Sequence, residues 1–386
     1  MSEQTDPIKS LQSGCWFKLI CGASYQHLPV IRNLALAYTL AGVDCIDVAA
    51  DPTVIKIVQE AVDTAAELRV GSPWHDPFYR PWLMISINDG EDPHFRKATF
   101  NPEHCPADCS RPCISTCPTA AITFAENDPS GVISSRCYGC GRCFTVCPPQ
   151  VIEAENHVTP AVTVLSQVIG AVDAIEIHTQ IGRQQPFEQL FQRIQPYLSQ
   201  LKLLSISCPN GDGVIDYLWQ LYRTLEPLSI PLVWQTDGRP MSGDIGSGTT
   251  HATIRYGQKM LQTGPPGYIQ LAGGTNHQTV PKLSMLPGWN NAEKSIACFN
   301  GNPGNKLSPF FGGVAYGSYA RKLLQPIFST LEMNTDMACS GQGNAMHLET
   351  FPDLLEQAVQ QCRALMGPLK GLHSTTTAPP LSPVIV

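Results

Sequence analysis

The sequence predicts an α/β fold: a (β/α)8 TIM-like barrel that is interrupted after its third strand by a small, cysteine-rich α+β domain. Short apolar runs recur along the chain and most are followed by a helical pattern, which is typical of parallel strands buried on both faces. The runs begin at intervals that suit a barrel, apart from one long interval. Eight of the 15 cysteines lie between Cys105 and Cys147, inside that interval.

Eight apolar runs are expected to form the barrel strands. They are FKLIC (17–21), CIDVA (45–49), WLMISI (82–87), AIEIH (174–178), LLSISC (203–208), PLVWQ (231–235), YIQLA (268–272) and GGVAY (312–316). The segment after the first run has apolar residues at helical spacing, with Gly42 as a stop signal. After the second run, Asp51 is a candidate N-cap and Pro52 suits the first helical turn.

The spacing between the runs places the inserted domain. Successive runs begin 28, 37, 92, 29, 28, 37 and 44 residues apart, whereas one βα unit of a barrel takes about 30–35 residues. Removing about 35 residues from the long interval leaves about 57, which suits a two-cluster ferredoxin module. An open doubly wound sheet stays possible, because only closure separates it from a barrel.

Four segments follow from this spacing. Residues 1–92 are expected to hold the first three strands, 93–157 the insert, 158–370 the last five strands and a C-terminal helix, and 371–386 a disordered tail rich in Ser, Thr and Pro. Loops that follow barrel strands lie at the face where barrel active sites are built. The insert would therefore bring its cysteines over the mouth of the barrel.

The second half of the cysteine block matches the bacterial ferredoxin run for a [4Fe–4S] cluster. Its spacing is Cys137-x2-Cys140-x2-Cys143-x3-Cys147-Pro148. Gly139 and Gly141 let the backbone approach the cluster and turn its N–H groups toward the sulfurs. The fourth cysteine is expected at a turn into a helix, with Pro148 in its first turn.

The first half of the block repeats this pattern with wider gaps. Its spacing is Cys105-x3-Cys109-x3-Cys113-x3-Cys117-Pro118, and its end CISTCPTAAI aligns with CFTVCPPQVI of the other run. Such duplication is typical of two-cluster ferredoxins, in which the fourth cysteine of each run ligates the other cluster. One [4Fe–4S] cluster is therefore assigned to Cys137, Cys140, Cys143 and Cys117. The other is assigned to Cys105, Cys109, Cys113 and Cys147.

Two other kinds of cysteine site have spacings that can be compared with this block. Two zinc sites stay an alternative, although zinc ribbons pair well-separated C-x2-C knuckles rather than two runs of four. A radical enzyme that uses S-adenosylmethionine would need Cys-x3-Cys-x2-Cys, and the gaps here are x3 and x3. The spacing thus favours an iron–sulfur module of ferredoxin-like α+β type as the insert.

The last two barrel strands lead into candidate ligand-binding loops. Barrel phosphate sites commonly use these loops, and here Gly273 and Gly274 follow the seventh strand while Gly317 and Ser318 open a helix after the eighth. Backbone N–H groups at such places bind phosphate. We expect a flavin or another phosphorylated ligand there. The alternative is that the glycines only permit tight turns.

Polar residues inside apolar strands are candidates for a barrel centre. Glu176 and His178 lie two residues apart on the fourth strand and share a face, which in a barrel could point inward. Lys18 on the first strand could join them. Each alone is more simply a satisfied structural group than a catalyst, so no catalytic residue is assigned.

Composition excludes several functions. The net charge of −7 argues against non-specific binding to nucleic acid or to an anionic membrane. No apolar run reaches about 18 residues, so no membrane span is expected. The start MSEQTDPIKS lacks the apolar region of a secretory signal. The sequence therefore predicts a cytoplasmic protein.

Segments along nearly the whole chain resemble the light-dependent period family of cyanobacteria. They are the opening SGCWFKLICGASYQHLPVIRNLALAYTLAGVDCIDVAADPTVI, the two cysteine runs, IQLAGGTNHQT and FGGVAYGSYARK. The resemblance implies an iron–sulfur protein that modulates circadian period by sensing cellular redox state, which follows light through photosynthetic electron transport. It also implies partners among clock-input or clock proteins, such as the histidine kinase CikA. The electron donor stays open.

Two other functions stay open from the residues alone. The barrel could be an oxidoreductase that binds a flavin or phosphorylated ligand, with the clusters as its electron conduit. The clusters could also serve only to hold the insert folded. Binding of a partner that follows cluster reduction would favour the sensor over both.

Overall fold

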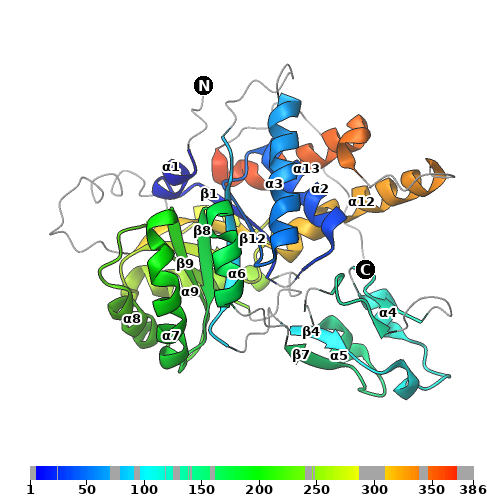
Figure 1. Ribbon diagram of the computed structural model, residues 1–386, viewed down its shortest axis with the longest axis horizontal. Coiled ribbons are helices and arrows are strands. Elements are labelled where there is room, and N and C mark those ends of the chain that lie inside the picture. Colours follow the sequence, from blue (N-terminus) through cyan, green and yellow to red (C-terminus); the bar gives the residue numbers. More distant parts are fainter. Residues whose placement is uncertain are drawn as a thin grey trace.

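Eight parallel strands close into a barrel in the order β1, β2, β3, β8, β9, β10, β11 and β12, which pairs again with β1 (Figure 1). The computed structural model describes residues 6–23, 25–69, 79–90, 96–117, 119–124, 131–137, 139, 141–156, 161–239, 246, 248–286, 309–338 and 347–371. Closure confirms the predicted (β/α)8 fold and rules out the open doubly wound sheet.

The barrel elements follow the predicted alternation. The strands are β1 (Trp16–Gly22), β2 (Cys45–Ala49), β3 (Trp82–Asn88), β8 (Ala174–His178), β9 (Leu203–Pro209), β10 (Leu232–Asp237), β11 (Tyr268–Ala272) and β12 (Phe310–Tyr316). The helices are α1 (Pro7–Gln12), α2 (Leu28–Ala41), α3 (Pro52–Arg69), α6 (Ala161–Val168), α7 (Gln184–Ile194), α8 (Val214–Leu225), α9 (Thr249–Thr263), α10 (Thr279–Ser284), α12 (Ser318–Ala338) and α13 (Pro352–Lys370).

The two predicted helix signals near the N-terminus are confirmed. Gly42 ends α2 in the left-handed conformation, at a φ of 95°, which glycine adopts without strain. Asp51 accepts a hydrogen bond from the N–H of Thr53 at 2.7 Å, so it caps α3 as expected. No described helix combines the length and apolarity needed to cross a bilayer.

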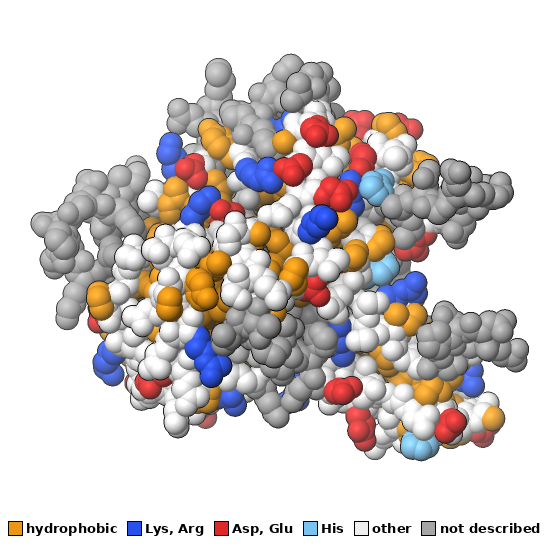
Figure 2. Space-filling model, in the orientation of Figure 1, with side chains coloured by type: hydrophobic (Ala, Val, Ile, Leu, Met, Phe, Trp, Pro, Cys, Tyr) orange, Lys and Arg blue, Asp and Glu red, His pale blue; other side chains and the backbone are white. Residues whose placement is uncertain are grey.

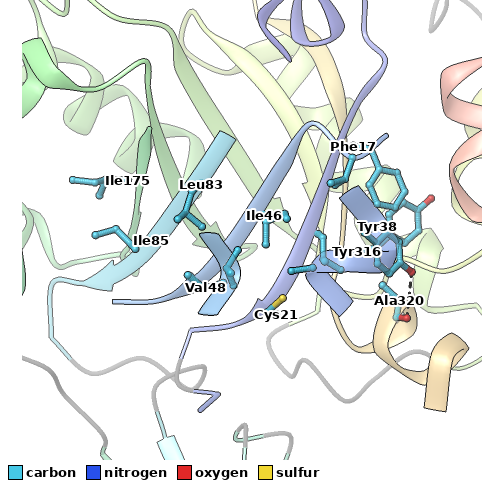
Figure 3. Packing of buried hydrophobic residues seen from close by; sticks show 14 of the residues in the cluster. Phe17, Cys21, Tyr38, Ile46, Val48, Leu83, Ile85, Ile175, Tyr316 and Ala320 are labelled. Carbon is cyan, nitrogen blue, oxygen red and sulfur yellow. Dashed lines mark hydrogen bonds between the residues drawn. The ribbon is translucent and has the colours of Figure 1, made fainter. Parts of the chain in front are cut away.

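The main core lies between the barrel and its helices. Figure 3 shows outward side chains of neighbouring strands packed in this layer, among them Phe17 and Tyr316. The rings of these two residues stack with centroids 4.9 Å apart. Tyr38 of α2 lies against Phe17 and donates its hydroxyl to the carbonyl of Ala320 at 3.2 Å. The layer ties α2 and α12 to the strands.

The inside of the barrel has an apolar end and a polar end. Leu11 of α1 packs with a second apolar cluster that includes Trp16, Trp82 and Met84, and this cluster fills the amino end of the barrel. Further along, the inward positions of several strands are polar, as at Lys18 of β1. Side chains alternate between faces, so every second residue of a strand points inward. The inward residues that are polar lie toward the carboxyl end.

Between β3 and β8 the chain forms elements outside the barrel. Strand β4 (Arg96–Thr99) pairs antiparallel with β7 (Glu153–Asn156), and β5 (Ile122–Thr123) pairs with β6 (Gly131–Val132). The short helices α4 (Pro112–Thr116) and α5 (Arg142–Val146) pack against each other. Figure 1 shows these elements to one side of the barrel. We refer to them together as the insert.

The predicted boundaries of the four segments stay predictions. The limits at 92/93 and 157/158 fall in stretches 91–95 and 157–160, which lie outside the described residues. The predicted tail is likewise outside them, apart from Gly371. On the face drawn in Figure 2, acidic and basic side chains of the described residues are interspersed.

Candidate metal centre and barrel cavity

The helices α4 and α5 repeat one backbone geometry. Each follows a residue in the left-handed conformation, Arg111 at a φ of 52° and Gly141 at 72°. Each is followed by a cysteine with extended backbone, Cys117 or Cys147. A non-glycine residue at positive φ is uncommon, so Arg111 marks a geometry that the local structure imposes.

The repeat continues beyond each of these cysteines. Ala120 and Gln150 stand three residues on, with φ values of 47° and 53°. Their N–H groups donate to the carbonyls of Cys117 and Cys147 at 3.3 and 3.2 Å. The helix predicted to begin at Pro148 is wrong. The residues after Cys147 form a turn, and the helix of this unit lies before the cysteine. In the first unit the helix α4 likewise lies before Cys117.

Backbone N–H groups point at three of the cysteine sulfurs. The bonds run from Ala98 to Cys137 at 3.4 Å, from Ala121 to Cys117 at 3.2 Å and from Arg111 to Cys109 at 3.4 Å. Such bonds stabilise negative charge on a thiolate or on cluster sulfur. None of these three bonds comes from Gly139 or Gly141. The role predicted for these glycines in directing N–H groups at sulfur therefore stays a prediction.

The cysteines line a small apolar core within the insert. Cys113, Cys137, Cys143 and Cys147 are buried together with Ala98, Ile122 and Ile152, whereas Cys105, Cys109 and Cys117 are half-buried. Burial raises the pKa of the Cys113 thiol, and charge on Cys147, then on Cys105 and Cys109, raises that pKa further. These three are the thiols with which the sequence groups Cys113.

Seven of the eight predicted ligands are cysteines outside any disulfide bond, and Cys140 lies outside the described residues. Among the residues that are described, no three His, Cys, Asp or Glu side chains converge closely enough to hold one metal ion. A [4Fe–4S] cluster does not need its ligands to converge on one ion, because each of its four thiolates binds a different iron.

A buried lysine connects the insert to the barrel. Lys97 of β4 donates to the side-chain oxygen of Gln26 at 3.0 Å and to the carbonyl of Ser134 at 2.8 Å. Gln26, which follows β1, donates in turn to the carboxylate of Asp51 after β2 at 2.8 Å. Burial lowers the pKa of Lys97, and charge on Cys137 and Asp51 partly offsets that. The insert therefore contacts loops at the carboxyl end of the barrel, the face predicted for it.

The polar centre of the barrel brings together Lys18 and two carboxylates. The ammonium of Lys18 lies 2.5 Å from Glu176 and 3.1 Å from Asp47, and all three side chains are buried. Burial alone would lower the pKa of Lys18, but the two carboxylates raise it. Burial raises the pKa of Asp47, although Lys18 opposes this.

Glu176 is held ionised by several partners. Burial would raise its pKa, but Lys18 first and then His178 lower it to about 2. His178 lies 3.1 Å from the carboxylate, and Ser205 and Gln235 donate to it at 2.7 and 2.9 Å. The expected inward positions of Lys18, Glu176 and His178 are thus confirmed, and each has the partners of a structural polar group.

A cavity opens at the carboxyl end of the barrel, beside this centre. Its lining includes all four predicted ligand residues, Gly273, Gly274, Gly317 and Ser318. It also includes residues that the sequence did not single out for this role, Ser86, Gln235, Thr275 and Arg321. Arg321 stands one helical turn after Ser318 in α12, and this spacing was the signal that could have found it.

The paired glycines after β11 have a packing reason of their own. Gly273 and Gly274 have φ values of 63° and 93°, and a Cβ atom on Gly273 would lie 2.7 Å from the carbonyl oxygen of Arg239. The tight-turn interpretation therefore accounts for these two glycines. A Cβ atom on Gly317 would instead make an ordinary 3.6 Å contact with Ile20.

Two family models match the chain. One is described as the light dependent period A C-terminal domain and matches residues 168–368. The other is described as the LdpA Fe-S cluster-binding domain and matches residues 105–158, which include all eight cysteines of the block. The two matches together cover the insert from Cys105 onward and the five barrel strands from β8 to β12.

Curated relatives agree with these matches. Light dependent period A from Synechococcus elongatus is 48% identical over 365 residues, which cover 94% of this chain and 94% of that protein. The thiosulfate reductase electron transfer subunit PhsB from Salmonella typhi is 40% identical over 55 residues, which cover 14% of this chain and 27% of that protein. A solved structure of the pneumococcal exo-β-D-N-acetylglucosaminidase StrH covers 94% of this chain and 99% of its own, at 10% identity and a TM-score of 0.30.

Proposed function

Because the chain belongs to the light-dependent period family, we propose that it is an iron–sulfur protein of circadian period control whose two [4Fe–4S] clusters sense cellular redox state. One observation carries the proposal: the duplicated cysteine units of the insert, which share the ending Cys-x3-Cys-Pro and the backbone geometry around it. The thiols, the N–H groups directed at sulfur and the apolar surroundings fit such a cluster. When bound, it supplies one-electron transfer.

The ligand assignment is part of the proposal. Cys117 would join Cys137, Cys140 and Cys143 on one cluster, and Cys147 would join Cys105, Cys109 and Cys113 on the other. The two runs lie together, because Cys113 and Cys147 belong to one cluster of buried residues, which is consistent with this exchange of fourth ligands. The packing of α4 against α5 supports it too, because each helix precedes a fourth cysteine.

A redox sensor requires that a change in the charge of a cluster alter the surface to which a partner binds. An added electron changes the local charge beside Cys137, whose sulfur accepts the N–H of Ala98. The neighbouring residue is Lys97, which bonds to Gln26 at the barrel mouth. A change in this contact would favour one arrangement of insert and barrel over another, and a partner that binds the two differently would report it.

Binding to a clock-input protein tests the sensor role. We propose the histidine kinase CikA as such a partner. Its affinity for the anaerobic holoprotein should differ several-fold between the oxidised form and the dithionite-reduced form, measured by calorimetry at equal protein concentrations. Equal affinities in the two states, or no binding in either, would contradict the proposed partner.

Removing the charge of Lys97 should make the potential of the cluster beside Cys137 more negative. A nearby positive charge favours the added electron, so Lys97→Met should lower the midpoint potential by roughly 50 mV, an interaction of about 1 kcal/mol. Potentiometric titration followed by EPR measures this. Lys202→Met removes an equal charge from the barrel surface and should leave the potential unchanged. Equal potentials for Lys97→Met and the unmodified protein, at equal iron content, would show that Lys97 does not act on the cluster.

A further inference from the structure

The cavity at the carboxyl end of the barrel contains a helix N-terminus with an unsatisfied hydroxyl. Ser318 is the first residue of α12, a helix of 21 residues, and its side chain lines the cavity. Ser318 is 8% exposed, and within the described part of the chain its Oγ has no hydrogen-bond partner. Buried hydroxyls are almost always bonded, so this one points to a ligand atom.

A guanidinium lies on the same side of the helix. Arg321 also lines the cavity and is 5% exposed. It donates to the carbonyl of Cys21, and its guanidinium lies over the ring of Tyr25 with 4.9 Å between carbon and centroid. These contacts fix a positive charge one turn from Ser318, where the first N–H groups of α12 have no partner within the helix. Charge, N–H groups and hydroxyl together suit a phosphate group.

The loop after β11 also lines the cavity, through Gly273, Gly274 and Thr275. Thr253 and Thr249 of α9 donate to the carbonyls of Gly273 and Gly274 at 2.5 and 2.8 Å. These oxygens are therefore already bonded on the α9 side of the loop.

The deeper part of the cavity has the opposite charge. Asp237 and Glu176 line it, and the charge of Glu176 is already matched by Lys18. Asp237 accepts a hydrogen bond from Ser207 and lies 3.4 Å from the side-chain nitrogen of Gln235. A carboxylate there suits a ligand group that donates hydrogen bonds, such as a hydroxyl.

We propose that this cavity binds a small phosphate monoester, with its phosphate at Ser318, Arg321 and the N-terminus of α12 and its hydroxyl groups toward Asp237. The volume of the cavity is about 60 Å3, which holds a few water-sized groups. The site is separate from the cysteines and does not depend on the clusters. Sugar phosphates and flavin mononucleotide share the phosphate chemistry, and we favour the smaller class.

Calorimetry on the full-length holoprotein tests the site with inorganic phosphate, ribose 5-phosphate and flavin mononucleotide. Ribose 5-phosphate should bind, and more tightly than phosphate. Ser318→Ala removes a hydroxyl without a partner, so it should keep the fold and weaken binding about tenfold. Ser318→Asp suits a helix N-terminus but repels phosphate, so it should abolish binding. Thr330→Ala, on the same helix outside the cavity lining, should change nothing.

The outcomes distinguish sugar phosphates from flavin mononucleotide as the ligand. Ser318-dependent binding of ribose 5-phosphate but not of flavin mononucleotide supports the proposal as stated. Ser318-dependent binding of flavin mononucleotide alone would support the phosphate site but overturn the small ligand. If none of the three probes binds, or if both Ser318 variants bind like the unmodified protein, the site is refuted while the iron–sulfur proposal stands.

Discussion

Replacing Cys147 with alanine should remove the same cluster as replacing Cys105, although Cys147 belongs to the other cysteine run. Each variant should lose about half of the iron and sulfide and keep about four irons per chain, because four thiolates hold each cluster. The physical reason is that the fourth cysteine of each run ligates the other cluster in two-cluster ferredoxins. Cys117→Ala should in turn match Cys137→Ala.

EPR of the reduced variants identifies which cluster survives. The spectra of Cys147→Ala and Cys105→Ala should coincide, and should differ from the shared spectrum of Cys117→Ala and Cys137→Ala. Cys15→Ala removes a cysteine outside the block and should keep about eight irons, as two cubanes require. If Cys147→Ala instead matches Cys137→Ala, each run binds its own cluster and the assigned exchange is wrong.

Replacing Lys18 with methionine should destabilise the barrel by about 3–5 kcal/mol, because it leaves two buried carboxylates without their cation. The pH dependence of the free energy of unfolding should also reverse. In the unmodified protein the pKa of Glu176 is lowered from its ordinary value of 4.5, which stabilises the fold at pH values above 4.5. This stabilisation is lost as the pH falls toward about 2. Without Lys18, burial raises the pKa of both carboxyls, so the variant should lose stability as pH rises from about 5 to 7.

Urea unfolding followed by tryptophan fluorescence measures this, since the predicted insert contains no tryptophan. The control is Lys202→Met, which removes an ion pair with Asp173 whose lysine is 55% exposed. A surface pair of this kind contributes about 0–1 kcal/mol. An unfolding free energy of Lys18→Met that equals that of the control would show that the buried pairs are not important for stability.

The barrel was predictable because its physical cause lies in local sequence. Runs such as AIEIH (174–178) are apolar at Ile175 and Ile177 and polar between them, so alternation alone sets which side chains face inward. The same rule indicated that Glu176 and Lys18 could both point into the barrel. It could not predict closure, which depends on pairing between β1 and β12, more than 290 residues apart in the chain.

The cavity and the insert were less predictable, because their geometry depends on turns. The expected helix after Cys147 was wrong since spacing does not say on which side of a cysteine a short helix forms. Arg321 was not recognised, although its spacing from Ser318 was visible, because a lone arginine has many structural roles. The contact of Lys97 with Gln26 joins separate parts of the chain, and no local pattern indicates it.

The iron and sulfide content of the anaerobically purified protein, with EPR of its reduced form, tests the account most directly. Two [4Fe–4S] clusters predict about eight irons and about eight sulfides per chain, with signals from paramagnetic reduced clusters. Stoichiometric zinc, or protein without metal from oxygen-free preparations, would contradict the account and remove the basis for a role in redox sensing.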